Sequence, residues 1–461
     1  MGRIQRSAQG PVAEIACAPR LRAETHFRSR KEAVEKALVN QRSMTKRLVA
    51  ATLCGIPATL LANGMRLASQ DAFACARGEA FVATADNPSA IYYNAAGITQ
   101  LEGDQVQFGI YGIYLDPTFV PPDGAGNSGR TYRIGHNLAA VPQFFYTHRL
   151  RNERLSFGLG IYSPHGADVS WPQDTGFRAV ATDAALKYIR FSPVVALKLL
   201  PGLSVGAGAM VDYGNIELEQ GLLRTASPFA NFFRFKADGW SAGYTAGLRY
   251  QPHEKVSLGA SFRSRTTITM SGKTEFEQQP VIQPTSLPAR ADFEFPLTAA
   301  FGISYRPTAA WNLEFNADYT DWSSLRTVTI HQEERPPYPI QQDISMKLQW
   351  QLSWLFAFGV TRYFEHNWHA SAGYVFNENS VPNAYYTPLA ADLDRHFLSI
   401  GVGHKGRRFD FDVAYQFGYG PAHTVTGSAP SSQPGFFAGQ TANGSYAFIS
   451  HAVLVTAGLR F

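Results

Sequence analysis

One His-x-Ser tripeptide in this chain has a spacing that could suit nucleophilic catalysis. His369 and Ser371 are separated by one residue, and a histidine beside a serine can take the hydroxyl proton and create a nucleophile. A chain with 12 histidines is expected to contain such a tripeptide by chance, and no third residue that would orient the histidine can be identified. P-loop, dinucleotide-binding and zinc motifs are absent from the sequence. We therefore predict that the protein is not an enzyme and that it holds no cofactor and no metal ion.

Arg263 and Arg265 are the residues best suited to bind an anionic group. They fall in the segment 256–270, which alternates like a β-strand, and we expect both to lie on its inward face. A guanidinium group holds a carboxylate through two parallel hydrogen bonds, so these arginines are candidates for the head group of a substrate. The alternative is that they pair with acidic residues on neighbouring inward faces, such as Glu314 and Asp318.

A third candidate is a cluster of phenylalanines within residues 217–238, which we expect to form an exposed outer loop. Apolar side chains that are exposed together usually mark a binding surface. We predict that this cluster captures an apolar ligand. The alternative is that it packs the loop against the structure beneath it. Its members are Phe229, Phe232, Phe233 and Phe235.

These candidates are carried by segments in which apolar and polar residues alternate, from residue 104 to residue 461. In one of them Phe409, Phe411 and Val413 alternate with Asp410 and Asp412. Successive side chains of a strand point to opposite faces, so each segment has one apolar face and one polar or small-residue face. Most runs reach about ten residues, which is long enough to cross a membrane and longer than most soluble strands. We predict fourteen strands: 104–114, 139–150, 155–163, 186–200, 203–216, 239–251, 256–270, 292–306, 311–327, 346–363, 367–377, 393–405, 408–420 and 446–461.

The connections between the predicted strands alternate in length. Residues 115–138 and 164–185 are long connections, whereas 151–154 and 201–202 are short ones. Short periplasmic turns and long outer loops are typical of outer-membrane barrels. The last predicted strand ends at Phe461, an aromatic residue of the kind that barrel-assembly machinery recognises. The sequence therefore predicts an all-β fold, a 14-stranded antiparallel transmembrane β-barrel.

The net charge of +5 comes from the beginning of the chain. Residues 1–47 contain 11 Lys and Arg and 4 Glu, a net charge of +7, so the remainder carries a net charge of −2. This distribution gives no support to a nucleic-acid partner. We predict that 1–43 is a basic extension ahead of the true start. We predict that 44–62 is a signal peptide, because a basic segment precedes a short apolar stretch that ends in small residues. The three cysteines all lie within the first 75 residues.

Residues 63–103 lack the alternation and are predicted to form a small plug in the lumen, ahead of the barrel at 104–461. Small residues with turn-forming asparagines predict short, compactly packed helical turns. An asparagine side chain can bond nearby backbone groups and hold a tight turn, so we expect Asn94 to fix the plug where it meets the wall. The plug motif comprises Asn87, Pro88, Asn94, Ala95 and Gly97.

The segments Ala-Arg-Gly-Glu-Ala-Phe, Ala-Asp-Asn-Pro-Ser-Ala and Tyr-Asn-Ala-Ala-Gly-Ile resemble the FadL-type family of outer-membrane transporters for long-chain fatty acids and toluene. Ala95 stands where the family usually has proline. The resemblance implies a monomeric barrel, closed by an N-terminal hatch, among the lipids and lipopolysaccharide of a Gram-negative outer membrane. It also implies that substrate is captured among outer loops, enters a lumen pocket and leaves at a kink in the third strand.

We therefore predict that the protein transports hydrophobic molecules, either long-chain fatty acids or aromatic and aliphatic hydrocarbons, by passive diffusion through a plugged barrel. The alternatives are a non-selective porin and an outer-membrane lipolytic enzyme. Assays of uptake separate the three, because a porin admits small sugars and a lipolytic enzyme hydrolyses phospholipid.

Overall fold

The computed structural model describes residues 64–461, except for 152–153, 223–230, 280–281, 339 and 431–438. All described residues belong to one compact unit. The predicted basic extension at 1–43 and the predicted signal peptide at 44–62 lie outside the described residues. Among the helices that are described, none is long and apolar enough to span a membrane.

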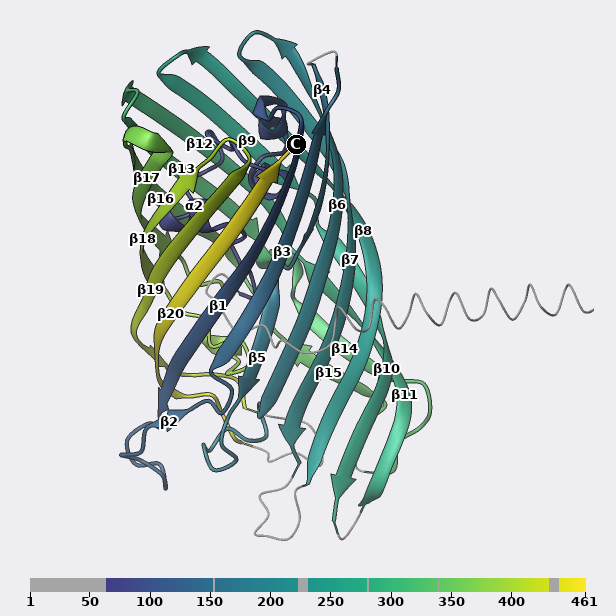
Figure 1. Ribbon diagram of the computed structural model, residues 1–461. Coiled ribbons are helices and arrows are strands. Elements are labelled where there is room, and N and C mark those ends of the chain that lie inside the picture. The colour runs from purple at the N-terminus through teal and green to yellow at the C-terminus, as the bar shows by residue number, and fades with distance from the viewer. Residues whose placement is uncertain (1–63, 152–153, 223–230, 280–281, 339, 431–438) are drawn as a thin grey trace, which may run out of the picture. The chain divides into compact units, whose positions relative to one another are not determined.

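Fourteen antiparallel strands form a closed barrel, which confirms the predicted fold class (Figure 1). The barrel closes where Gln105–Val120 of the first strand pairs with Ser445–Arg460 of the last. Nine strands are continuous: β1 (Asp104–Val120), β3 (Leu138–Arg149), β6 (Asp183–Leu200), β7 (Leu203–Gly221), β8 (Phe232–His253), β17 (Trp368–Asn377), β18 (Arg395–Lys405), β19 (Phe409–Val425) and β20 (Gly444–Arg460).

The other five strands are each interrupted once. Each interruption divides one strand into two labelled segments. The first of the five interrupted strands is the third strand of the barrel. The pairs are β4 (Leu155–Tyr162) with β5 (Gly166–Ser170), β9 (Val256–Arg263) with β10 (Thr266–Gln278), β11 (Ile282–Phe295) with β12 (Leu297–Thr308), β13 (Trp311–Asp321) with β14 (Thr327–Gln332), and β15 (Asp343–Lys347) with β16 (Leu352–Tyr363). A short segment, β2 (Tyr132–Arg133), adds to the edge of β1.

Six short connections lie at the end of the barrel that holds the C-terminus, which we call the short-turn end (Figure 1). This end is the one predicted to face the periplasm. Its turns are 150–154, 201–202, 254–255, 309–310, 364–367 with η3 (Glu365–Asn367), and 406–408. The opposite end, the long-loop end, carries the longer connections, including 171–182 and 378–394, the latter with η4 (Asn383–Tyr385).

Aromatic side chains mark two levels on the outer face of the barrel. Toward the long-loop end, the rings of Tyr319 and Trp354 on neighbouring strands lie 5.3 Å apart. Toward the short-turn end, Trp311 and Trp368 are outward and exposed. Aromatic belts of this kind are typical of the two boundaries of the hydrocarbon layer. The predicted alternation of faces therefore has its physical basis in lipid outside the wall and a packed lumen inside it.

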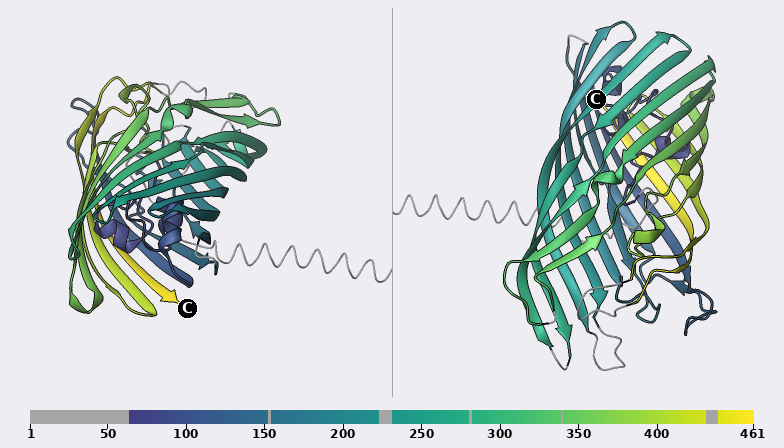
Figure 2. Two further views of the ribbon diagram at one scale, coloured as in Figure 1. Left: turned by 90° about the horizontal axis from the view of Figure 1, so that it is seen from above. Right: turned by 180° about the vertical axis from the view of Figure 1, so that it is seen from behind.

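The plug comprises residues 64–103 and lies inside the ring of strands, as the view along the barrel shows (Figure 2). It contains α2 (Ala72–Ala76), α3 (Ala90–Tyr93) and η1 (Ala95–Gln100). All residues of α2 and α3 are buried, although the helices are too short to be stable alone. Contacts with the barrel wall therefore hold the plug in its conformation.

Candidate functional site

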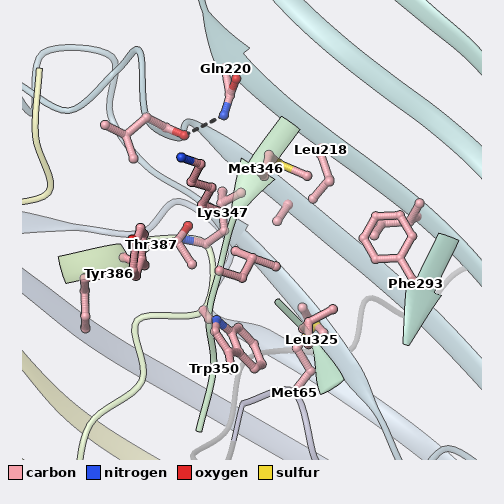
Figure 3. A pocket seen from close by; sticks show the side chains of 18 of the residues that line it. Met65, Leu218, Gln220, Phe293, Leu325, Met346, Lys347, Trp350, Tyr386 and Thr387 are labelled. Carbon is pink, nitrogen blue, oxygen red and sulfur yellow. Dashed lines mark hydrogen bonds between the residues drawn. The ribbon is translucent and has the colours of Figure 1, made fainter. Parts of the chain in front are cut away.

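An apolar cavity of about 470 Å³ lies in the lumen between the plug and the long-loop end (Figure 3). Its volume falls within the range of sites that bind small organic molecules. Lys347 is the only charged residue among the described residues that line it. The larger apolar side chains of the lining include Leu186, Ile216, Leu218, Phe293, Ile344, Met346 and Trp350.

The first residues of the plug, Gly64–Leu67, form a strap beneath this cavity. Gly64 has a φ of +67°, and an added Cβ would lie 2.5 Å from the Trp350 ring and 2.8 Å from the Trp322 ring. Only glycine fits this position, because a side chain would be both strained and in collision. The Gly64 N–H donates a hydrogen bond of 3.0 Å to the buried Asp392 carboxylate. The strap is therefore fixed at its first residue.

The third strand of the barrel is interrupted at Ser163–His165. The strand before it, β3, pairs with β4 only over Phe144–Arg149, and no ladder on this side is found for residues 138–143 among the described strands. On the side of the interruption nearer the long-loop end, the wall is closed by a hydrogen bond of 2.8 Å from the Gly135 N–H to the Ser170 carbonyl. This break is the kink that the family resemblance led us to expect in the third strand.

The plug, rather than β3, satisfies the backbone groups of this kink. The Leu67 N–H donates to the Pro164 carbonyl at 2.8 Å, and the Gly166 N–H donates to the Met65 carbonyl at 3.0 Å. The Gln70 side chain donates to the Ser163 carbonyl at 2.9 Å. Because unsatisfied backbone groups are costly when buried, the strap and the kink stabilise one another.

The Arg66 side chain, between the two strap residues that bond the kink, is anchored on β13. The Arg66 guanidinium lies 2.6 Å from the Asp318 carboxylate and 3.2 Å from the Thr320 hydroxyl, and both charged side chains are largely buried. The strap thus joins the third strand of the barrel to the ninth.

A second break in the wall runs across the four strands from the seventh to the tenth. Their interruptions fall at 264–265, Pro296, 322–326, which contains η2 (Trp322–Ser324), and 348–351. Beyond them, β14 and β15 form a hairpin, which we call the flap (Thr327–Lys347). On one side the flap is joined to β11 by two ladder pairs and by one further backbone hydrogen bond, from the Glu333 N–H to the Pro288 carbonyl. The flap is therefore the most weakly paired part of the described wall.

Asn94 occupies the predicted position between plug and wall. Its side-chain amide is fully buried and donates to the Val82 carbonyl at 2.8 Å and to the Leu248 carbonyl of β8 at 2.9 Å. Its side-chain oxygen accepts from the Ala96 N–H at 3.2 Å and caps η1. A Cβ at Gly247 would lie 2.3 Å from this oxygen, so a barrel glycine makes room for the plug.

The rest of the plug motif also has a packing role in the structure. Asn87 donates a 2.8 Å hydrogen bond to Asp71 and accepts hydrogen bonds from Ser89. Pro88 lines a small polar cavity at the short-turn end. Ala95 is buried, with its backbone against Gly206 of the wall, and a Cβ at Gly97 would lie 2.3 Å from the Ala85 carbonyl.

Ion pairs fix the plug at the short-turn end. Asp86 lies 3.6 Å from Arg306 and 3.8 Å from Lys405, which come from two different parts of the wall. Burial alone would raise the pKa of the Asp86 carboxyl, but the positive charges of Lys405 and Arg306 hold it at about 2. A straight path through the short-turn end would require these contacts to break.

The prediction that Arg263 and Arg265 share the inward face is wrong. The interruption between β9 and β10 shifts the alternation by one residue. Arg263 is buried and bonds the Tyr92 carbonyl of the plug, with its guanidinium 4.4 Å from the Tyr92 ring centre. Arg265 is exposed on the outer face and pairs with Asp321 at 3.0 Å.

Neither arginine pairs with Glu314 or Asp318, which were the alternative partners. Glu314 instead lies 3.3 Å from Arg77 and accepts from the Ala83 N–H at 2.7 Å, while Asp318 pairs with the strap. These inward acids bind the plug.

The prediction that the phenylalanine cluster forms an exposed loop is also wrong. β7 continues to Gly221 and β8 begins at Phe232, so the strands extend well past the predicted boundaries. Phe233 and Phe235 point into the lumen and are buried, and Phe232 is half-buried, 4.6 Å from the Arg234 guanidinium. Phe229 lies outside the described residues.

The His-x-Ser tripeptide does not form a catalytic pair in the described contacts. His369 Nε2 lies 2.6 Å from the Asp412 carboxylate, and the Ser371 hydroxyl bonds Thr361 at 2.8 Å. The two side chains thus have separate partners.

Sequence reasoning missed Lys347 and the strap. Lys347 is the last residue of β15, whereas the predicted strand 346–363 ran through the interruption at 348–351 and so did not show that Lys347 belongs to a separate segment. Gly64 and Arg66 were included in the plug, but their partners are more than 250 positions away in the sequence. The unusual charge of Arg66 in a small-residue segment was the one available signal.

Comparison with known proteins agrees with this architecture. Residues 55–459 match the family described as outer membrane protein transport protein (OMPP1/FadL/TodX). The chain belongs to this family. It is therefore an outer-membrane transport protein of the FadL/TodX type, which confirms the predicted family and location.

Individual relatives are distant in sequence. The long-chain fatty acid transport protein of Escherichia coli (strain K12) is 21% identical over 380 residues, which cover 73% of this chain and 83% of that protein. The structure of a Pseudomonas aeruginosa FadL homologue matches 86% of this chain and 100% of its own, with 18% identity and a TM-score of 0.74. The P. putida toluene transporter TodX matches 86% and 99%, with 16% identity and a TM-score of 0.66. At these identities the two structures support the fold.

Proposed function

We propose that this outer-membrane transporter carries long-chain fatty acids, by passive diffusion down their gradient. The observation that carries the proposal is the position of Lys347. It supplies a single positive charge to a cavity that is otherwise apolar, and no ion pair to it is found among the described residues. A fatty acid has the matching chemistry, an apolar chain with one carboxylate.

A neutral hydrocarbon would gain nothing from this lysine. Burying apolar area stabilises both kinds of ligand, at roughly 25 cal/mol per Å². Only an anionic ligand also gains the charge-assisted hydrogen bond, so Lys347 favours a carboxylate over a hydrocarbon of the same length. The E. coli relative named above is a long-chain fatty acid transport protein, whereas TodX is a toluene transporter.

The contacts of the plug favour a sideways exit. The plug is held at the short-turn end by Asp86 and against the wall by Asn94. At the third-strand kink, by contrast, only the strap separates the lumen from the outer face, because β3 has no ladder partner there among the described strands. We propose that the substrate leaves the cavity between β3 and β5 when the strap moves.

The affinity of the purified protein for palmitate and for hexadecanol tests the substrate class. Lys347→Gln is expected to weaken palmitate binding about tenfold, the equivalent of about 1.4 kcal/mol, and to leave hexadecanol binding nearly unchanged. Lys347→Arg, which keeps the charge, is the matched control and should retain palmitate affinity within about threefold. Equal effects of Lys347→Gln on the acid and the alcohol would mean that the substrate is a neutral hydrocarbon.

A further inference from the structure

The flap has a free edge beside the cavity. Among the described strands, β15 pairs with β14 alone, although its continuation β16 pairs with a strand on each side. The segment that would have to pair with β15, residues 378–394, runs as a loop with one short turn of helix. Tyr386 and Thr387 of this loop line the cavity opposite the free edge.

The cavity reaches around this edge to the outer side of the wall. Successive residues of a strand point to opposite faces, so a cavity confined to the lumen would contact every second residue. Four consecutive residues of β15, from Ile344 to Lys347, line the cavity. Figure 3 shows Met346 directed toward Leu218 and Phe293, and Lys347 extending from the other side of the strand.

The opening beside β15 lies at the level of lipid head groups. The flap begins beyond the Tyr319–Trp354 aromatic belt, on the side of the long-loop end. The outward residues of its two strands are all polar: Thr327, Thr329, His331, Asp343, Ser345 and Lys347. A polar outer face just beyond an aromatic belt belongs to the water-exposed boundary rather than to the hydrocarbon layer.

We infer that the free edge of β15 borders a lateral entrance for single-chain amphiphiles that lie in the outer leaflet. The apolar chain passes between β15 and the loop at Tyr386–Thr387 into the cavity, while the head group stays at the boundary beside Lys347. Such a ligand would not have to leave the membrane surface to reach the protein. This inference rests on the proposed function, since it assigns a route to the same fatty acid.

A reversible block at the free edge tests the entrance. Ser345→Cys places a thiol on the edge strand, where benzyl methanethiosulfonate adds a bulky group that dithiothreitol removes. Thr329→Cys is the matched control, because its hydroxyl lies 2.9 Å from that of Ser345 but on β14, one strand away from the opening. Cys75 is buried, and unsubstituted protein treated in the same way gives the background labelling.

We expect modified Ser345→Cys to lose at least fivefold of its palmitate uptake in cells, with recovery in dithiothreitol, whereas modified Thr329→Cys changes less than twofold. Full labelling of Ser345→Cys, verified by mass, without loss of uptake would overturn the entrance, as would an equal loss in both variants. Palmitate binding to the unmodified purified protein is measured in parallel. Failure of that binding would overturn the proposed function instead, so the two failures are distinguishable.

Discussion

The barrel wall is interrupted on two sides of one cavity, and the two breaks differ in what borders them. At the third-strand kink the outward residues of β3 are apolar, with Leu138, Ala140 and Pro142 facing lipid. In the two strands of the flap, every outward residue is polar. The kink lies within the hydrocarbon layer and the flap lies at its boundary, so the same cavity meets two different environments.

The breaks also differ in how they are closed. The plug strap bonds the backbone of the kink directly, whereas the free edge of β15 meets no strand among those described. A break that the plug bonds can be opened only by moving the plug. A free edge can admit a flexible chain without a change in the barrel. The comparison therefore assigns a controlled exit to the kink and an uncontrolled entrance to the flap.

Removal of the kink should have the largest effect on transport. Deleting Ser163–His165 joins β4 to β5 and leaves Tyr162 and Ala167 on the lumen side, so the third strand could pair with β3 along its length. We expect uptake of palmitate to fall more than tenfold while the amount of folded barrel in the membrane stays similar. A matched deletion of 124–126 should leave uptake unchanged, because an added Cβ at Gly124 or Gly126 would have no atom of a non-adjacent residue within 4 Å. Normal uptake after the kink deletion would show that the substrate does not leave through the kink.

Loosening the strap should have an intermediate effect. Arg66→Met leaves the Asp318 carboxylate buried without its partner, which typically costs about 3–5 kcal/mol. We expect the strap to detach and small sugars to enter liposomes that contain this variant faster than those with unsubstituted protein. A second substitution, Asp318→Asn, removes the unpaired charge, so the double variant should admit sugars more slowly than Arg66→Met alone. If the Arg66→Met variant admits sugars no faster than the original protein, the kink is sealed without the strap.

The plug should also respond to pH through Glu79, which accepts hydrogen bonds from Ser69 at 2.5 Å and Tyr93 at 2.6 Å. Burial raises the pKa of the Glu79 carboxyl to about 7, above its ordinary value of 4.5. The folded plug therefore holds a proton that the unfolded chain releases, and stability is present below pH 4.5 and lost as pH rises to 7. At about 1.4 kcal/mol per pH unit, the loss is about 3 kcal/mol.

Glu79→Gln should remove this dependence. The protection factors of plug amides, which are exchange rates corrected for their intrinsic pH dependence, are expected to differ between pH 5 and pH 7.5 more strongly in the original protein than in the variant. The neighbouring Asp71 carboxyl, whose pKa burial raises to about 6, stays in both proteins and sets the residual dependence. Protection factors that are lower at pH 5 than at pH 7.5 would contradict the assignment.

The strands could be predicted from the sequence because their faces meet two different media. Every continuous strand overlaps its predicted range, since lipid on one side and a packed lumen on the other impose the alternation residue by residue. The same rule failed at Arg265, because one irregular position between β9 and β10 inverts every face that follows it.

The candidate site was harder to predict, since it depends on contacts between distant parts of the chain. The cap that Asn94 forms on η1 could be predicted because it is a local contact, whereas its bond to Leu248 of β8 joins residues 154 positions apart. The partner of Arg66 lies 252 positions away, and the free edge of β15 is defined by a ladder that fails to form. Neither a distant ion-pair partner nor a missing strand ladder produces a pattern among neighbouring residues of the sequence.

The position of the plug ahead of the wall strands in the chain has a consequence for folding. The strap is bonded to the third strand and to the ninth, whereas the wall is completed only when the last strand pairs with the first. Because the plug helices are too short to be stable alone, the plug can take its final conformation only when these strands surround it. The plug is therefore a product of the contacts of the barrel rather than a separate domain that folds first.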